Sequence, residues 1–176
     1  MAIEVELRSF ISEEKYKELL EFFAREGKFV NEDNQVTYYF DSDEDLRIQK
    51  NDFFSKIWLK KGKMHDEHRE EIEVKFPKED FDKLEAMFLT LGYNVKIKWF
   101  RKRHVFSWEG VDAMVDYTKG YGYILELEKL TDERGKEETL KLLREKFALL
   151  GISVTPKEEF DKQFKNYQEN WRSLVG

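Results

Sequence analysis

The chain has 176 residues, a length that fits one domain with room for a sizeable buried core. Hydrophobic residues make up 40% and aromatic residues 15%, which excludes a disordered protein, while the absence of cysteine excludes disulfides, cysteine zinc sites and thiol nucleophiles. Charged residues reach 39% although the net charge is only −6, so many opposite charges must coexist, and the bulk charge disfavours nucleic acid as a partner.

The apolar runs are too short for a transmembrane helix, and we expect no membrane partner. The first residues do not have the pattern of a signal peptide, and no Gly/Ser-rich linker marks a domain boundary. We therefore expect a soluble, cytoplasmic protein with a single domain over residues 1–176, present as a monomer or a homodimer.

The first predicted strand covers residues 4–8, which read Glu-Val-Glu-Leu-Arg and alternate charged with apolar side chains. This period of two is typical of a half-buried strand. A helical pattern follows, in which Ser12 is placed to cap the start and Gly27 to end the helix. Leu19 and Phe23 share the apolar face of that helix.

Further strands follow, each rich in β-branched and aromatic residues and bounded by turns. Residues 71–75, Glu-Ile-Glu-Val-Lys, repeat the alternation of the first strand, and residues 126–129, Glu-Leu-Glu-Lys, repeat it again. The other predicted strands are residues 35–41, 45–50, 54–61, 95–108 and 111–118.

Helical patterns also follow the second and third acidic strands. One begins near Pro77 and ends at Gly92, and the other ends at Gly151. The two ends share the pattern Phe-x-x-Leu-Gly-x-x-Val, and its apolar pairs are Phe88 with Leu91 and Phe147 with Leu150. A last helix is predicted from Pro156 to Leu174.

The polar side chains that alternate along these strands are unusually uniform, because some strands carry acids and others carry bases. One interpretation is a solvated sheet face with ion pairs between neighbouring strands. The other is an α+β fold in which an eight-stranded, mostly antiparallel β-barrel has helices packed outside and a polar lumen for one small ligand. Acids clustered in such a lumen would bind hard cations, and clustered arginines and lysines would bind phosphates.

Several motifs occur in a fixed order along almost the whole chain. The first is Glu4-x-Glu6-x-Arg8, and the others are Tyr39-Phe40-Asp41, Leu46-Arg47-Ile48-Gln49, Lys56-x-Trp58-x-x-Lys61-Gly62, Arg69-x-Glu71-x-Glu73, Arg101-x-Arg103, Asp116 with Gly120-Tyr121-Gly122, Glu126-Leu127-Glu128 and Lys165-Asn166-Tyr167. Together they resemble the CYTH superfamily, the triphosphate tunnel metalloenzymes, and are closest in form to class IV adenylate cyclase-like and thiamine triphosphatase-like members. Arg8 stands where the signature has lysine, and Gln49 where a second arginine is usual.

The resemblance implies roles for specific residues. Its implied ligands for Mg²⁺ or Mn²⁺ are Glu4, Glu6, Asp116, Glu126 and Glu128. Its implied triphosphate-binding residues are Arg8, Arg47, Lys61, Arg69, Arg101 and Arg103, and its implied catalytic residues are Glu4, Glu6, Arg8, Glu71 and Glu73. Glu71 and Glu73 would bind a second metal ion or orient basic residues. Strand alternation does not let both Lys56 and Lys61 face a lumen without a bulge, and we expect Lys61 there because it directly precedes Gly62.

Three functions fit such a site. The first is metal-dependent hydrolysis of a linear triphosphate, with tripolyphosphate, thiamine triphosphate or ATP as the small-molecule substrate. The second is a class IV adenylate cyclase, in which the ribose 3′-hydroxyl attacks the α-phosphate of ATP to give cyclic AMP and pyrophosphate. The third is a module that binds polyphosphate or nucleotide without catalysis. We expect hydrolysis.

Overall fold

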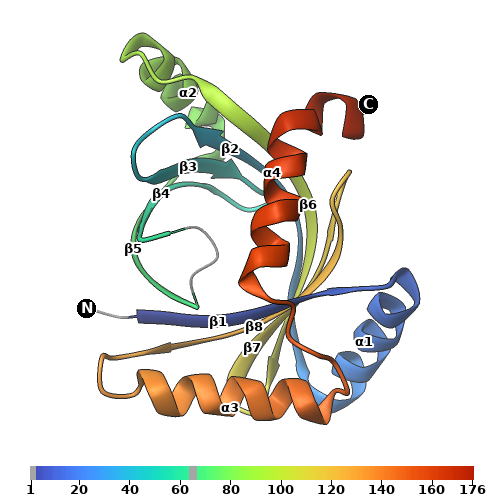
Figure 1. The fold of residues 1–176 in the computed structure, drawn as a ribbon. Coiled ribbons are helices and arrows are strands. Elements are labelled where there is room, and N and C mark those ends of the chain that lie inside the picture. The colour runs from blue at the N-terminus through green and yellow to red at the C-terminus, as the bar shows by residue number, and fades with distance from the viewer. Residues whose placement is uncertain (1–2, 64–66) are drawn as a thin grey trace.

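The computed structural model describes residues 3–63 and 67–176, which form eight strands and four α-helices (Figure 1). The elements in chain order are β1 (Ile3–Ile11), α1 (Glu13–Glu26), β2 (Lys28–Phe40), β3 (Asp45–Lys50), β4 (Ser55–Lys61), β5 (His68–Phe76), a 3₁₀ turn (Lys78–Asp80), α2 (Phe81–Thr90), β6 (Val95–Trp108), β7 (Val111–Thr118), β8 (Gly122–Thr131), α3 (Lys136–Leu149) and α4 (Lys157–Leu174).

The eight strands form one closed antiparallel barrel in the order β1-β5-β4-β3-β2-β6-β7-β8. The seam between β1 and β8 is long, with pairs running from Ile3 opposite Thr131 to Ile11 opposite Tyr123. The predicted α+β barrel is therefore confirmed. β2 begins at Lys28, earlier than expected, because its first half pairs along the 14-residue strand β6.

Helices cover the barrel from outside, as Figure 1 shows. α3 packs on β1 and β8, α1 packs on β2, β6, β7 and β8, α2 packs against β3, and α4 crosses over β6. Phe23 and Phe147 are fully buried in the core under α1 and α3, whereas Tyr167 is buried under α4. Among the described residues, no helix combines the length and hydropathy that a membrane crossing requires.

The predicted apolar faces of the helices are confirmed except at one position. Leu19, Phe23 and Phe147 are buried, and Phe88 and Leu150 pack against core clusters. Leu91 was expected to pack outside the barrel as well, but it is 71% exposed. Leu91 is the first residue past α2, as Leu150 is past α3, so the shared sequence pattern alone does not decide whether this position is buried.

The shared pattern at the ends of α2 and α3 produces the same local structure twice. Gly92 and Gly151 both have positive φ angles, of 94° and 65°, which glycine adopts without steric cost. The carbonyl of Phe88 accepts from the amide of Tyr93 at 3.0 Å, and the carbonyl of Phe147 accepts from the amide of Ile152 at 3.1 Å. One pattern therefore ends both helices with the same hydrogen bond.

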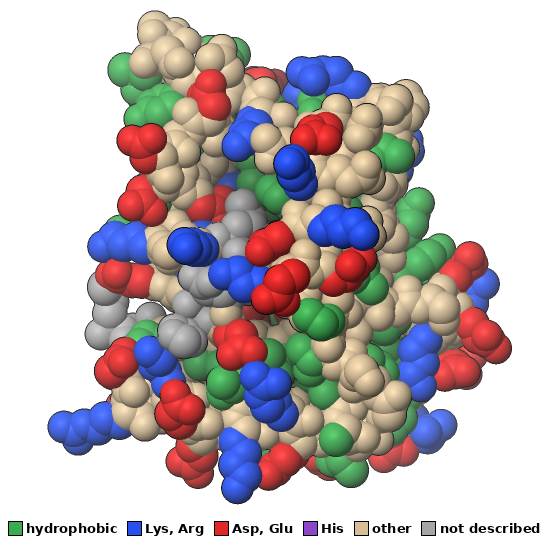
Figure 2. Space-filling view, viewed as in Figure 1, with side chains coloured by type: hydrophobic (Ala, Val, Ile, Leu, Met, Phe, Trp, Pro, Cys, Tyr) green, Lys and Arg blue, Asp and Glu red, His purple; other side chains and the backbone are tan. Residues whose placement is uncertain are grey.

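Alternation along each strand separates an apolar outside from a polar inside. On β1 the side chains of Val5 and Leu7 are buried against the helices, whereas those of Glu4, Glu6 and Arg8 line the interior of the barrel. The acids and bases of the strands therefore meet inside the barrel rather than on a solvated sheet face. The face of the molecule shown in Figure 2 carries charges of both signs side by side.

Candidate active site

A cavity of about 250 Å³ occupies the barrel, and each of the eight strands contributes at least one side chain to it. Of the residues that the sequence predicted for metal binding, triphosphate binding or catalysis, all but Lys61 line this cavity. The barrel thus brings together residues from position 4 to position 128, which lie at opposite ends of the barrel sequence. Phe160 and Phe164 of α4 also contribute to the wall.

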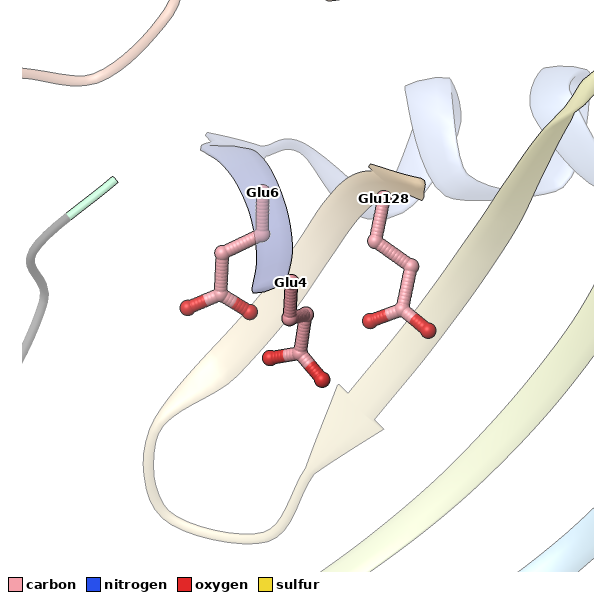
Figure 3. Close-up of side chains that lie close together, drawn as sticks. All are labelled: Glu4, Glu6 and Glu128. Atoms are coloured by element: carbon pink, nitrogen blue, oxygen red, sulfur yellow. The ribbon is translucent and has the colours of Figure 1, made fainter. Parts of the chain in front are cut away.

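Three carboxylates form the acid triad, which we define as Glu4, Glu6 and Glu128 (Figure 3). Each offers a carboxylate oxygen, and these oxygens lie within 4.8 Å of one another. The triad arises at the seam of the barrel, because Glu6 of β1 is directly opposite Glu128 of β8. Like charges opposite each other on adjacent strands repel, so this pairing is unfavourable unless a proton or a cation compensates it.

The electrostatics of the acid triad favour a bound cation. Burial, followed by the charges of Glu126 and Glu4, raises the pKa of Glu128 to about 9. Burial is also the main cause that raises the pKa of Glu6. Oxygen-only donors with carboxylate charge are the ligands that Mg²⁺ and Mn²⁺ prefer. The donor set therefore fits the divalent metal that the sequence predicted.

Asp116 and Glu126, the other two predicted metal ligands, lie outside the acid triad. Both are held by Arg103, whose Nη2 is 2.6 Å from an oxygen of Asp116 and 3.1 Å from an oxygen of Glu126. Burial acts to raise the pKa of Glu126, but the charges of Arg103, Arg8 and Arg101 outweigh it and lower this pKa to about 2. We call Arg103, Asp116 and Glu126 the arginine-paired region.

The five predicted arginines reach the cavity from four strands: Arg8 from β1, Arg47 from β3, Arg69 from β5, and Arg101 and Arg103 from β6. Their partners differ in charge. The guanidinium of Arg101 donates from Nε and Nη2 to the amide oxygen of Gln35, at 2.8 and 2.7 Å, and lies 3.6 Å from the carboxylate of Asp116. A neutral amide thus supports Arg101 without cancelling its charge. Burial, followed by repulsion from Arg103, lowers the pKa of Arg101.

The prediction that Lys61 faces the lumen is wrong. Its side chain is 50% exposed and lies 3.3 Å from Glu70 on the outside, whereas Lys56 and Lys60 line the cavity. The pairing of β4 with both neighbours is regular, so the period of two starting at Lys56 reaches Lys60 and not Lys61. The alternation rule was correct, and the position next to Gly62 was the wrong criterion for choosing between the lysines.

Glu71 and Glu73 each meet a lysine of β4 inside the barrel. Lys60 lies 3.1 Å from Glu71 and 2.7 Å from Glu4, and the Nζ of Lys56 donates to Glu73 at 2.8 Å. The pKa of Lys60 is raised, because the charges of Glu6 and Glu4 outweigh its burial. Two roles were considered for Glu71 and Glu73, binding a second metal ion or orienting basic residues. These contacts with lysines match the second role.

Sequence reasoning missed several residues that shape the site. Lys60 could have been found by following the alternation from Lys56. Asp45 could have been found in the same way, because it lies two positions before Arg47 on the same strand, and its carboxylate accepts from that guanidinium. Gln35 gives no such signal, since only the pairing of β2 with β6 brings it opposite Arg101.

The chain is similar in sequence to known proteins. Residues 2–164 match the profile of the CYTH domain. A Methanocaldococcus jannaschii protein named "putative adenylate cyclase" is 33% identical over 86% of this chain and 91% of its own length.

Two solved structures are similar in fold. A conserved hypothetical protein from Pyrococcus furiosus has a TM-score of 0.77 and 26% identity, over 87% of this chain and 95% of its own. A Hippeastrum protein, described as a "putative adenylyl cyclase" with a dominant triphosphatase activity, has a TM-score of 0.65 and 20% identity, over 88% of this chain and 90% of its own.

Proposed function

Because the chain belongs to the CYTH family, whose members act on triphosphates and use divalent metals, we propose that it is a metal-dependent enzyme that hydrolyses a linear triphosphate. The observation that carries the proposal is one cavity in which three clustered carboxylates and five arginines face the same space. A triphosphate needs both, because cleaving it is mainly a matter of positioning and charge neutralisation.

The basic residues supply the binding. A triphosphate carries about four negative charges at neutral pH, and arginine offers two parallel hydrogen bonds to a phosphate group. Two arginines are best placed to donate to phosphate oxygens. Arg101 is held by the neutral Gln35, and the Nε of Arg69 has no hydrogen-bond partner among the described residues. Arg8, Arg47 and Arg103 extend the same basic wall.

The acid triad supplies the metal site. Glu4, Glu6 and Glu128 would hold Mg²⁺ or Mn²⁺, which would supply neutralisation of phosphate charge and Lewis-acid polarisation of a phosphoryl oxygen. The carboxylates themselves are held in place by strand pairing and by Lys60, which contacts Glu4 at 2.7 Å. Repulsion within the triad is relieved by the cation, so metal binding and proton release are coupled.

The size of the cavity favours a substrate whose enclosed part is short. Pockets for drug-sized ligands usually measure roughly 300–1,000 Å³, and this cavity measures about 250 Å³. A triphosphate fits such a space better than a complete nucleotide does. We therefore favour tripolyphosphate over the other two candidate substrates. In thiamine triphosphate or ATP the organic group would extend beyond the arginines.

A class IV adenylate cyclase is the second candidate, and the 33% identical relative that bears this name favours it. The same arginines would hold ATP while its ribose 3′-hydroxyl attacks the α-phosphate, with pyrophosphate leaving. The Hippeastrum protein, described with a dominant triphosphatase activity, is an example in this fold of a protein named for cyclisation that mainly hydrolyses. Residence in the cytoplasm and a monomeric or homodimeric state remain predictions.

The test is incubation of the purified chain with Mg²⁺ or Mn²⁺ and with tripolyphosphate, thiamine triphosphate or ATP, followed by ³¹P NMR. Release of orthophosphate supports hydrolysis, and pyrophosphate with cyclic AMP supports the cyclase. Binding without any product from the three substrates would contradict both and leave a binding module. Glu6→Gln serves as the matched control, because it keeps the shape of a triad residue and removes its charge.

A further inference from the structure

We propose that Asp45 is a positioning residue that holds Arg47 and Arg69 together as one anion-binding site in the wall of the cavity. The inference rests on the proposed function, since it concerns how the same cavity holds a triphosphate. Asp45 belongs to none of the motifs that the sequence analysis singled out, and it does not itself line the cavity.

Asp45 bridges two arginines from strands that do not pair with each other. Its two oxygens accept from Nε and Nη2 of Arg47, at 2.6 and 2.5 Å, in a bidentate arrangement. One of these oxygens also lies 2.7 Å from Nη2 of Arg69. Arg47 is on β3 and Arg69 on β5, with β4 between them, so the carboxylate connects side chains across a whole strand.

This bridge is shielded from solvent, which strengthens its hydrogen bonds and holds the two guanidinium groups in place. The side chains of Asp45 and Arg69 are 7% and 4% exposed. A charge-assisted hydrogen bond in such surroundings is less screened than one on the surface, and removing one partner leaves the other charge uncompensated. The guanidinium of Arg47 is further confined by the ring of Tyr39, which lies 4.3 Å below it.

The bridge leaves part of Arg69 available for a ligand. Nη2 of Arg69 is used by Asp45 and by the carbonyl oxygen of Lys60 at 3.2 Å. Its Nε is buried and has no hydrogen-bond partner among the described residues, although Arg69 lines the cavity. A buried N–H without a partner is costly, so a turn of the guanidinium that brings Nε to an anionic oxygen in the cavity would relieve this cost. A phosphate oxygen is the anion that the proposed function brings there.

The negative charge of Asp45 would repel a polyanion, whereas its proposed positioning role would favour binding of that polyanion. The charges of Arg47 and Arg69 outweigh burial and lower the pKa of Asp45 to about 2, so it remains ionised at neutral pH. If Asp45 were only a counter-ion, removing its charge would strengthen the attraction of the cavity for a polyanion. If it positions the arginines, removing its charge would weaken binding. The two roles therefore predict opposite changes.

The experiment compares Asp45→Asn with wild type and with Asp43→Asn, an exposed acid two positions earlier that carries the same change of charge. Tripolyphosphate binding is measured by calorimetry without metal, and KM and kcat are measured with Mg²⁺. We expect Asp45→Asn to raise the dissociation constant and KM about tenfold with kcat changed less than threefold, and Asp43→Asn to stay within about twofold.

Arg69→Lys is the second variant, because it keeps the charge but cannot bridge to Asp45 and donate from a guanidinium Nε at once. We expect it to weaken tripolyphosphate binding about as much as Asp45→Asn does, and equal or tighter binding would overturn the inference even if Asp45→Asn does not fold. Wild-type binding together with equal or tighter binding by the variants overturns the inference alone. A wild-type chain that does not bind tripolyphosphate overturns the proposed function, and the inference with it.

Discussion

Glu126 and Glu128 are two residues apart on β8 and both line the cavity, yet their surroundings shift their pKa values in opposite directions. The pKa of Glu126 is lowered to about 2 in the arginine-paired region, and that of Glu128 is raised to about 9 in the acid triad. The charges of Arg103, Arg8 and Arg101 outweigh burial and lower the pKa of Glu126, whereas burial and the charges of Glu126 and Glu4 raise that of Glu128. Identical side chains at adjacent inward positions thus acquire different charge states from their surroundings inside the barrel.

This difference suits the two parts of the cavity to different ligands. In the arginine-paired region Arg103 already donates to two carboxylates, so a triphosphate must displace Asp116 or Glu126 to gain these hydrogen bonds. In the acid triad Glu4 pairs with Lys60 and Glu6 with Arg8, but Glu128 has no ion pair among the described residues. The triad therefore favours a cation, while the other region offers donors to phosphate. Four predictions test this division, beginning with the largest expected effect.

Replacing an acid of the triad should affect turnover most. Glu6→Gln keeps the volume of the side chain and removes a hard anionic ligand, so we expect metal-dependent hydrolysis to fall at least about 100-fold, the upper end of the cost of losing an outer-shell partner. Initial rates of orthophosphate release at several Mg²⁺ concentrations measure this. Unchanged rates at every concentration would remove Glu6 from the metal site.

Replacing the central arginine of the other region should affect binding. Arg103→Ala removes charge-assisted hydrogen bonds worth roughly 1.5–3 kcal/mol, so tripolyphosphate should bind about 10- to 100-fold more weakly. Calorimetry without metal separates this from any effect on the acid triad. Sodium chloride at matched ionic strength is the control, because a response equal to that of tripolyphosphate would indicate screening rather than a specific site.

The two lysines at the end of β4 should differ, although they are adjacent in sequence. Lys60→Met removes the cation that contacts Glu4 and Glu71 in the cavity, and we expect about tenfold weaker tripolyphosphate binding. Lys61→Met removes a half-exposed cation outside, and the expected change is less than about twofold. Equal losses in the two variants would contradict the alternation along β4.

The smallest expected effect concerns stability against pH. The folded-state pKa of Glu128 is about 9, above its ordinary value of 4.5, so the folded chain retains a proton that the unfolded chain has lost. Stability should therefore fall as pH rises between these two values. Glu128→Gln removes that loss, and in EDTA it should melt higher than wild type at pH 8, by about 2–4 °C per kcal/mol gained.

The control for that measurement is the pH dependence of the difference itself. At pH 4 both the folded and the unfolded wild-type chain carry a proton on Glu128, so the advantage of Glu128→Gln should vanish. Melting curves at pH 4, 6 and 8 test this. A constant difference across the range would show that the substitution acts through packing rather than charge.

Strand alternation by itself determined much of this protein. The period of two identified which side chains face inward on β1, β5 and β8, and the two Phe-x-x-Leu-Gly patterns identified where α2 and α3 end. These features are local, because the direction of a side chain follows from the backbone geometry of its own strand and a helix end follows from the conformation of one glycine. The ordered motifs then led from the inward residues to the family.

Which inward residues meet was decided only by the tertiary structure. Glu6 and Glu128 are opposite each other because the first and last strands of the barrel close its seam, and Asp45 reaches Arg69 because β3 and β5 lie on either side of β4. No local pattern encodes such a register. Charge interactions depend on distance and burial, so the opposite pKa shifts of Glu126 and Glu128 arise only once strands far apart in sequence have been brought together.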